Sequence, residues 1–209
     1  MKVVLAYVFP DILRATYVPL AERFVRTYME HPPGATDHEI HVLVNHGIHR
    51  MTGQYKKLFS PLQPQFMMHN NMGKDIGAYQ RIAEEVPADL MVFLGSPIRF
   101  TRAGWLDRIV QAYCDNGLAL YGCWGFHQPN DHIRTTAFWC PPQLLNSYPH
   151  RIGTESRYEF EHGNLSITAH VKHLGLPRLM VTWNGVYDRD NWRNIDHVES
   201  LFLDQHFER

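Results

Sequence analysis

Short apolar runs alternate along the chain with segments whose apolar positions recur every three or four residues. The runs at residues 2–9, 39–45, 65–69, 90–94, 118–125 and 178–183 predict strands. The run at 90–94 reads Leu-Met-Val-Phe-Leu, and an uninterrupted apolar run is typical of a central parallel strand covered on both faces. The helical spacing predicts helices over residues 17–28, 75–86, 105–113 and 159–174, with shorter helices near 55–59 and 197–207.

This order of elements predicts an α/β fold with a mostly parallel central sheet and helices on both faces. A chain of 209 residues is most simply one domain. Gly95-Ser96-Pro97 breaks the central strand at its carboxyl end. Ligands bind outside the carboxyl ends of strands in open α/β sheets, so we expect the functional site at this break.

The balance of charges and the lengths of the apolar runs argue against nucleic acid as the main partner and against a membrane-spanning segment. The formal charge is −1, with 20 basic and 21 acidic residues and no long block of either sign, so nucleic acid is not expected as the main partner. No apolar run approaches the roughly 18 residues that a membrane-spanning helix needs. The first apolar run follows a single lysine and lacks a small-residue cleavage site, so it is predicted to be a strand and not a signal peptide.

The cysteines and histidines do not have the spacing of a known metal-binding motif. The three cysteines form no CxxC pair and are predicted to be reduced thiols, in keeping with a cytoplasmic protein. Of the 14 histidines, pairs with HxxH spacing occur at residues 38–41, 46–49 and 170–173, without a third ligand at a recognisable offset. The spacing therefore predicts no metal-binding residues, and a metal hydrolase built from these histidines is only a third hypothesis. The sequence makes no prediction of oligomeric state.

Four short motifs occur along the chain, and their order is more specific than any one of them. They are Asn71-x-Gly73-x-Asp75-Ile76-Gly77-Ala78, the strand at 90–94 followed by an aromatic residue and Gly104-Trp105-Leu106, the segment His132–Trp139, and Tyr158-Glu159. Together they resemble the GT-A type of glycosyltransferase, especially the rhamnan-synthesis and related cell-surface polysaccharide families. The resemblance covers roughly residues 1 to 185, and its specificity comes from the order of the motifs.

The resemblance implies a single GT-A-like, Rossmann-like domain over residues 1–209. Residues 1–125 would form its nucleotide-binding half, and residues 126–209 its acceptor-side half and C-terminal tail. It also implies a hexosyltransferase type of enzyme, which transfers a sugar from a nucleotide-sugar donor to a glycan or glycolipid acceptor.

The chain departs from that family at the end of the central strand. GT-A enzymes carry an acidic motif there that holds a divalent ion, whereas residues 94–99 read Leu-Gly-Ser-Pro-Ile-Arg. Mg²⁺ and Mn²⁺ prefer carboxylate ligands. Three alternatives follow: a Mn²⁺ or Mg²⁺ ion held elsewhere, a non-catalytic degenerate GT-A domain that binds a nucleotide or carbohydrate, or a cationic clamp on the diphosphate built from Lys74, Arg99, Arg102 and Arg134.

The candidate donor-binding residues lie in the first half of the chain and at Arg134. The resemblance implies that Asp75 accepts a hydrogen bond from the base or ribose, although it would also serve as a helix N-cap. Gly73 and Gly77 would let the backbone approach the ligand, or serve only turns and packing. The full predicted set is Asp11, Gly73, Lys74, Asp75, Gly77, Ser96, Arg99 and Arg134.

The candidate catalytic and acceptor residues lie in the second half. Glu159 is the first choice as general base, Glu161 the second and Asp131 the third, since a base must reach the acceptor hydroxyl in its ionised form. Acidic residues at a helix start also simply favour the helix dipole. Aromatic rings stack on sugars but are often core, and histidines can orient a hydroxyl or lie on the surface. The predicted acceptor contacts are Trp124, Phe126, His127, His132 and Trp139.

Overall fold

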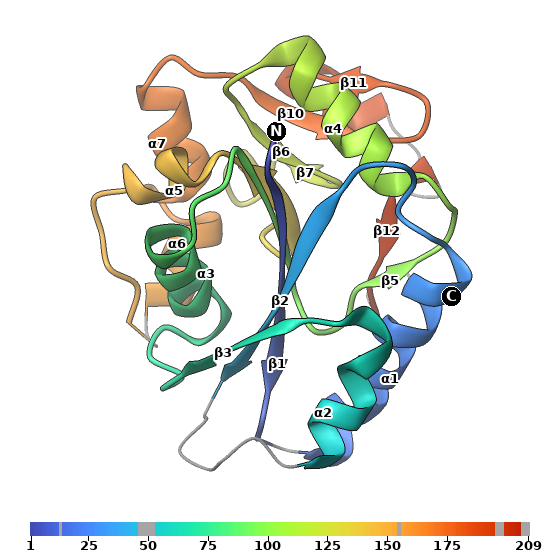
Figure 1. The fold of residues 1–209 in the computed structure, drawn as a ribbon. Helices are drawn as coiled ribbons and strands as arrows, with labels where there is room; N and C mark the ends of the chain where they lie inside the picture. The colour runs from blue at the N-terminus through green and yellow to red at the C-terminus, as the bar shows by residue number, and fades with distance from the viewer. Residues whose placement is uncertain (13, 46–52, 154–155, 195–198, 206–209) are drawn as a thin grey trace.

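An eight-stranded sheet runs through the middle of the molecule in the order β11-β10-β6-β9-β4-β1-β2-β3 (Figure 1). The computed structural model describes residues 1–12, 14–45, 53–153, 156–194 and 199–205. The strands of the sheet are β1 (Val3–Pro10), β2 (His38–Asn45), β3 (Gln65–His69), β4 (Leu90–Leu94), β6 (Leu120–Gly122), β9 (Ala137–Cys140), β10 (Arg178–Val181) and β11 (Val186–Tyr187).

Most neighbouring strands are parallel. β1 pairs in parallel with both β2 and β4, β2 pairs in parallel with β3, and β6 with β10. β9 is inserted between β4 and β6 and is antiparallel to both, and β11 forms an antiparallel edge on β10. The predicted mostly parallel sheet is confirmed.

The two faces of the sheet carry separate hydrophobic cores, because successive strand side chains point to opposite faces. Leu5, Tyr7 and Phe9 of β1 pack into one core with α1 (Arg14–Glu30), α2 (Gly53–Phe59) and α4 (Trp105–Asn116). Val4 and Val8 pack into the other with α3 (Lys74–Glu85), α5 (Pro142–Asn146), α6 (Arg157–His162) and α7 (Ile167–His173). Figure 1 shows these two groups on opposite sides of the sheet, so the prediction of helices on both faces is confirmed.

Two predicted elements are divided in the structure. The strand predicted at 118–125 ends as β6 at Gly122, and β7 (Gly125–Phe126) instead pairs with β8 (His132–Ile133) in a two-stranded sheet. The helix predicted at 159–174 is two helices, because the chain leaves the helical path at Gly163 and restarts after Ser166. The Ser166 side chain caps α7 by accepting from the Ala169 amide at 3.1 Å.

The predicted closing helix at 197–207 is wrong where the structure describes it. Within residues 199–205 the chain forms β12 (Phe202–Leu203), which pairs with β5 (Arg99–Phe100) and buries Phe202 among the aromatic rings of Phe100 and Trp105. The rest of that prediction, and the histidine pair at 46–49, lie outside the described residues. Two 3₁₀ segments, η1 (Ser60–Leu62) and η3 (Arg189–Asn194), complete the described elements. In the described part of the chain, none of the helices has the length and apolarity to cross a membrane.

Candidate functional site

A pocket of about 860 Å³ opens at the carboxyl ends of β1 and β4. Val8 and Pro10 of β1 and the turn Gly95-Ser96-Pro97 after β4 line it. At this point the strand order reverses, since β1 is followed by β2 and β3 on one side and by β4 on the other. Open α/β sheets bind ligands at such switch points. The pocket therefore lies where the break in the central strand predicts the site.

The turn after β4 is held by hydrogen bonds to its neighbours. The Ser96 hydroxyl donates to the Val8 carbonyl at 2.9 Å, and the Tyr7 hydroxyl donates to the Ser96 carbonyl at 3.2 Å. The Gly95 amide donates to the Thr136 carbonyl at 2.8 Å. The side chain of Ser96 is thus used to fix the turn, and no carboxylate within the turn is available for a metal ion.

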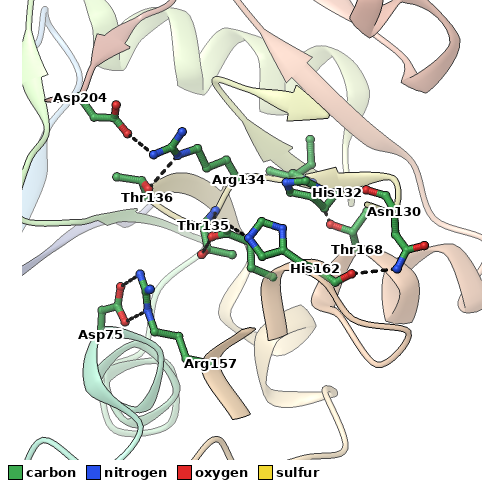
Figure 2. Close-up of polar contacts among 12 residues, drawn as sticks. Asp75, Asn130, His132, Arg134, Thr135, Thr136, Arg157, His162, Thr168 and Asp204 are labelled. Atoms are coloured by element: carbon green, nitrogen blue, oxygen red, sulfur yellow. Dashed lines mark hydrogen bonds and ion pairs between the residues drawn. The ribbon is translucent and has the colours of Figure 1, made fainter. Parts of the chain in front are cut away.

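A bidentate ion pair between Asp75 and Arg157 lies at one wall of the pocket (Figure 2). Arg157 Nε and Nη2 donate to the two carboxylate oxygens at 2.7 and 2.9 Å. These bonds raise the pKa of Arg157 further above its usual range, so the guanidinium stays charged. Gly73 occupies the N-cap position of α3 and Asp75 lies in the first turn, so Asp75 is not the predicted N-cap. Lys74 is exposed and lines the pocket beside it.

Arg134 reaches the pocket from the segment between β8 and β9. Its Nη2 lies 2.9 Å from an Asp204 carboxylate oxygen, and its Nε donates to the Thr136 hydroxyl at 3.1 Å. The guanidinium lies 5.8 Å from the ring centroid of Trp124, which is fully buried. Because Asp204 is also fully buried, this ion pair ties the stretch after β12 to the pocket wall.

Three potential metal ligands gather in the same pocket. His132, Glu161 and His162 each offer one ligand atom, and these atoms lie within 4.8 Å of one another. One Glu161 oxygen accepts from both the amide, at 2.9 Å, and the hydroxyl of Thr135. The other lies 2.9 Å from His162 Nε2. The imidazoles of His132 and His162 lie edge to face, with ring centroids 4.3 Å apart, near Thr135 (Figure 2).

The structure separates the predicted site residues into two groups. Those that line the pocket are Lys74, Asp75, Ser96, Phe126, His132, Arg134 and Glu161. Those outside its lining are Asp11, Gly73, Gly77, Arg99, Trp124, His127, Asp131, Trp139 and Glu159.

Several residues of the second group are buried in the core, hold the backbone or another side chain, or lie on other elements. Trp124 and Trp139 are fully buried in the core, and the Asp11 carboxylate accepts from the Tyr55 hydroxyl at 2.6 Å. Arg99 lies in β5, and Glu159 is exposed on α6. A Cβ at Gly77 would lie 1.9 Å from the Met72 carbonyl oxygen, so this glycine is required by backbone packing.

Asp131 lies in an ion-paired cluster beside the pocket. Arg189 donates to both of its oxygens, at 2.7 and 3.1 Å, and His127 Nδ1 lies 2.7 Å from one of them. Partial desolvation opposes ionisation, but the bonds from Arg189 and His127 outweigh it and lower the pKa of Asp131 to about 2. A carboxylate held in this way is a poor general base, because its proton affinity is low.

The Asp131 cluster predicts a defined loss of stability in acid. The folded pKa lies below the ordinary value of 3.8, so the contribution of the ionised carboxylate is complete above pH about 4 and is lost as the pH falls towards 2. In urea denaturation, Asp131→Asn should lower stability at pH 7 and flatten the dependence on pH between about 4 and 2. The exposed Asp115→Asn variant should keep the wild-type slope. An unchanged slope in Asp131→Asn would contradict this assignment.

Comparisons with known proteins give the fold. No protein-family model and no curated protein sequence matches the chain. Mouse xyloside xylosyltransferase 1 superposes with a TM-score of 0.57 at 7% identity, over 87% of this chain and 85% of that one. A CMP:2-keto-3-deoxy-manno-octonic acid synthetase complexed with CTP has a TM-score of 0.56 at 10% identity, over 85% and 88% of the two chains. A cytidylyltransferase from Leptospira borgpetersenii has a TM-score of 0.55 at 12% identity, over 98% and 81%.

These neighbours are a glycosyltransferase and two nucleotidyltransferases, so the GT-A-like fold is confirmed. Sequence reasoning did not select Arg157 or His162 for the site. Arg157 directly precedes the Tyr158-Glu159 motif, and its basic charge near that motif was the available signal. No comparable signal marked His162, because its approach to His132 is recognised only in three dimensions.

Proposed function

We propose that this protein binds a nucleotide-sugar donor in the pocket at the carboxyl ends of β1 and β4 and transfers the sugar to a glycan or glycolipid acceptor. The observation that carries the proposal is a set of cationic side chains, Lys74, Arg134 and Arg157, around a pocket at the switch point of a GT-A-like sheet. A glycosyltransferase and a protein bound to CTP among the fold neighbours support a nucleotide as the ligand.

Arg157 is the strongest candidate for binding the diphosphate. A guanidinium has five N–H donors, and the ion pair with Asp75 uses two of them. The remaining donors can bind phosphate oxygens while Asp75 holds the guanidinium in place. Lys74 adds a second positive charge at the same wall. A fixed positive charge stabilises the diphosphate as it leaves, because negative charge develops on the leaving group in the transition state.

The nucleoside would lie at the β1 side of the pocket. Ile12 and Tyr17 line this side, and the Tyr17 ring offers a face on which a base can stack. The acceptor would enter from the opposite side, where Phe126, Gln128 and His132 line the pocket. This assignment keeps residues 1–125 as the main nucleotide-binding half, with Arg134 and Arg157 contributed by the acceptor-side half.

Among the three carboxylates predicted as general base, Glu161 is the one that lines the pocket. In this place a carboxylate can accept the proton of the acceptor hydroxyl or hold a cation against the diphosphate. A non-catalytic domain that binds a nucleotide or carbohydrate is the second candidate function, favoured by the missing carboxylate in the Gly95-Ser96-Pro97 turn.

Ligand-dependent thermal unfolding followed by product analysis tests the proposal. The panel comprises UDP, GDP, dTDP, CDP and their common sugars, together with CTP, each with EDTA and with Mn²⁺. A ligand present at a hundred times its Kd stabilises the folded state by about 2.7 kcal/mol. We expect a shift of the unfolding midpoint for one nucleoside diphosphate, and release of that diphosphate from its sugar. Binding without turnover would favour the non-catalytic function, and pyrophosphate release from CTP with a sugar substrate would indicate nucleotidyl transfer.

A further inference from the structure

We propose that His132, Glu161 and His162 bind one divalent first-row transition-metal ion, and that its open coordination positions face the pocket. The inference rests on the proposed function and deepens it, because such an ion would bind the donor diphosphate beside Arg157, which lies one turn before Glu161 on α6. It differs from the arrangement implied by the family resemblance, in which the metal ligands follow the central strand.

The three side chains are close enough to share an ion. Their ligand atoms lie within 4.8 Å of one another, and Glu161 Oε1 lies 2.9 Å from His162 Nε2. Ligand atoms around one tetrahedral zinc ion lie about 3.4 Å apart, given metal–nitrogen bonds of about 2.0–2.1 Å. Small side-chain rotations would therefore complete the site.

Hydrogen bonds already orient two of the ligands. His132 is buried, and its Nδ1 lies 2.7 Å from the Asn130 carbonyl oxygen. A carbonyl oxygen only accepts, so Nδ1 carries the proton and Nε2 keeps the lone pair that a metal needs. The two Thr135 donors hold Glu161 Oε2 and leave Oε1 directed to His162. Such outer hydrogen bonds are typical of metal sites, where they fix the tautomer and orientation of the ligands.

Asn130 also connects the two histidines. Its backbone carbonyl accepts from His132, and its side-chain amide donates to the His162 carbonyl at 2.9 Å (Figure 2). The short loop before β8 is thereby tied to the end of α6, so the two imidazoles are brought together by the fold and not by sequence spacing.

The His162 ring has an unexplained nitrogen. Its Nδ1 is buried and has no hydrogen-bond partner among the residues that the structure describes. An ion shared with Glu161 would bind Nε2, the nitrogen that lies 2.9 Å from the Glu161 carboxylate, so Nδ1 would carry the proton and a buried water molecule would have to accept it.

The ligand set selects the class of ion. Two imidazoles and one carboxylate suit zinc, iron, cobalt or manganese, whereas Mg²⁺ prefers oxygen ligands alone. Three protein ligands leave at least one position for water or substrate, as in catalytic zinc sites. Because all three residues line the same pocket as Arg157, the substrate that reaches this position would be the diphosphate.

The test is a metal titration of the full chain without any nucleotide. Protein freed of metal by dialysis against EDTA is titrated with Zn²⁺ and with Mg²⁺ by calorimetry, and with Co²⁺ by visible absorption. We expect one Zn²⁺ per chain, much weaker binding of Mg²⁺, and ligand-field bands from Co²⁺. His132→Ala and Glu161→Gln should each weaken Zn²⁺ binding by about 100-fold or more, whereas His170→Ala, outside the cluster, should not change it. Thermal unfolding in EDTA confirms that each variant is folded.

Two outcomes would overturn the inference: a wild-type protein that binds no stoichiometric Zn²⁺ or Co²⁺, or Zn²⁺ binding that is unaffected in both cluster variants. Mg²⁺ bound as tightly as Zn²⁺ would overturn the assigned class of ion. Because the wild-type Co²⁺ spectrum needs no variant, a variant that fails to fold leaves the inference testable. Nucleotide binding that persists in EDTA while no metal binds would reject the metal site and keep the proposed function. Metal binding without any nucleotide binding would keep the metal site and reject the proposed function.

Discussion

Arg157→Met should weaken binding of the nucleoside diphosphate by about 10- to 100-fold. A hydrogen bond to a charged group contributes about 1.5–3 kcal/mol, and each 1.4 kcal/mol is about tenfold in Kd. The substitution also leaves the Asp75 carboxylate, which is 17% exposed, without its bidentate partner in the pocket, where its charge would repel a diphosphate. Calorimetric titration with the nucleoside diphosphate that shifts wild-type unfolding most would measure the change.

Two further variants make this prediction specific. Arg157→Lys keeps the charge but loses the fork of donors that matches a carboxylate, so its Kd should lie between wild type and Arg157→Met. Arg151 is an exposed arginine that pairs with Glu84 outside the pocket, so Arg151→Met should leave the Kd within about twofold. Equal losses in Arg157→Met and Arg151→Met would show that the effect is only one of overall charge.

Arg134→Met should lower the free energy of unfolding by about 3 kcal/mol or more. The substitution removes the guanidinium whose Nη2 lies 2.9 Å from an Asp204 carboxylate oxygen, and the Asp204 side chain has no exposed surface. Removing one member of a buried ion pair typically costs about 3–5 kcal/mol, because the remaining charge keeps its desolvation penalty. Urea denaturation at pH 7 would measure the loss.

A double-mutant cycle checks the cause of that loss. The combination of Arg134→Met with Asp204→Leu removes both charges, and it should recover most of the stability. Arg102→Met serves as a matched control, because this exposed arginine contacts the Trp183 ring at 4.6 Å and such a contact contributes about 0.5–1 kcal/mol. A double variant no more stable than Arg134→Met would mean that the charge on Asp204 is not the cause.

Local sequence signals predicted the framework of the fold well. The apolar run at 90–94 is the central strand β4, and the pocket opens at the turn that breaks it. The antiparallel insertion of β9 between β4 and β6 could not be predicted from local sequence patterns, because it depends on pairs such as Met91 with Cys140 that lie far apart in the chain. The long helix at 159–174 was predicted as one because its apolar spacing continues across Gly163, although the backbone does not.

The candidate site was predicted in part. Lys74, Asp75, Arg134 and Glu161 do line one pocket, because the first three follow the carboxyl ends of strands and Glu161 lies in the late helix α6. The cluster of His132 with His162 could not be predicted from spacing, since the two residues meet through the loop at Asn130 and not along one helix. The large aromatic residues Trp124 and Trp139 resembled sugar contacts, but burial removes both from any ligand.

The crystal structure of the protein soaked with the nucleoside diphosphate that gives the largest thermal shift would test the central claim most directly. We expect the diphosphate at the carboxyl ends of β1 and β4, within hydrogen-bond distance of Arg157 and near Lys74, with the base beside Tyr17. A nucleotide bound instead in the separate pocket around His150 and His170, or on another face with this pocket empty, would contradict it.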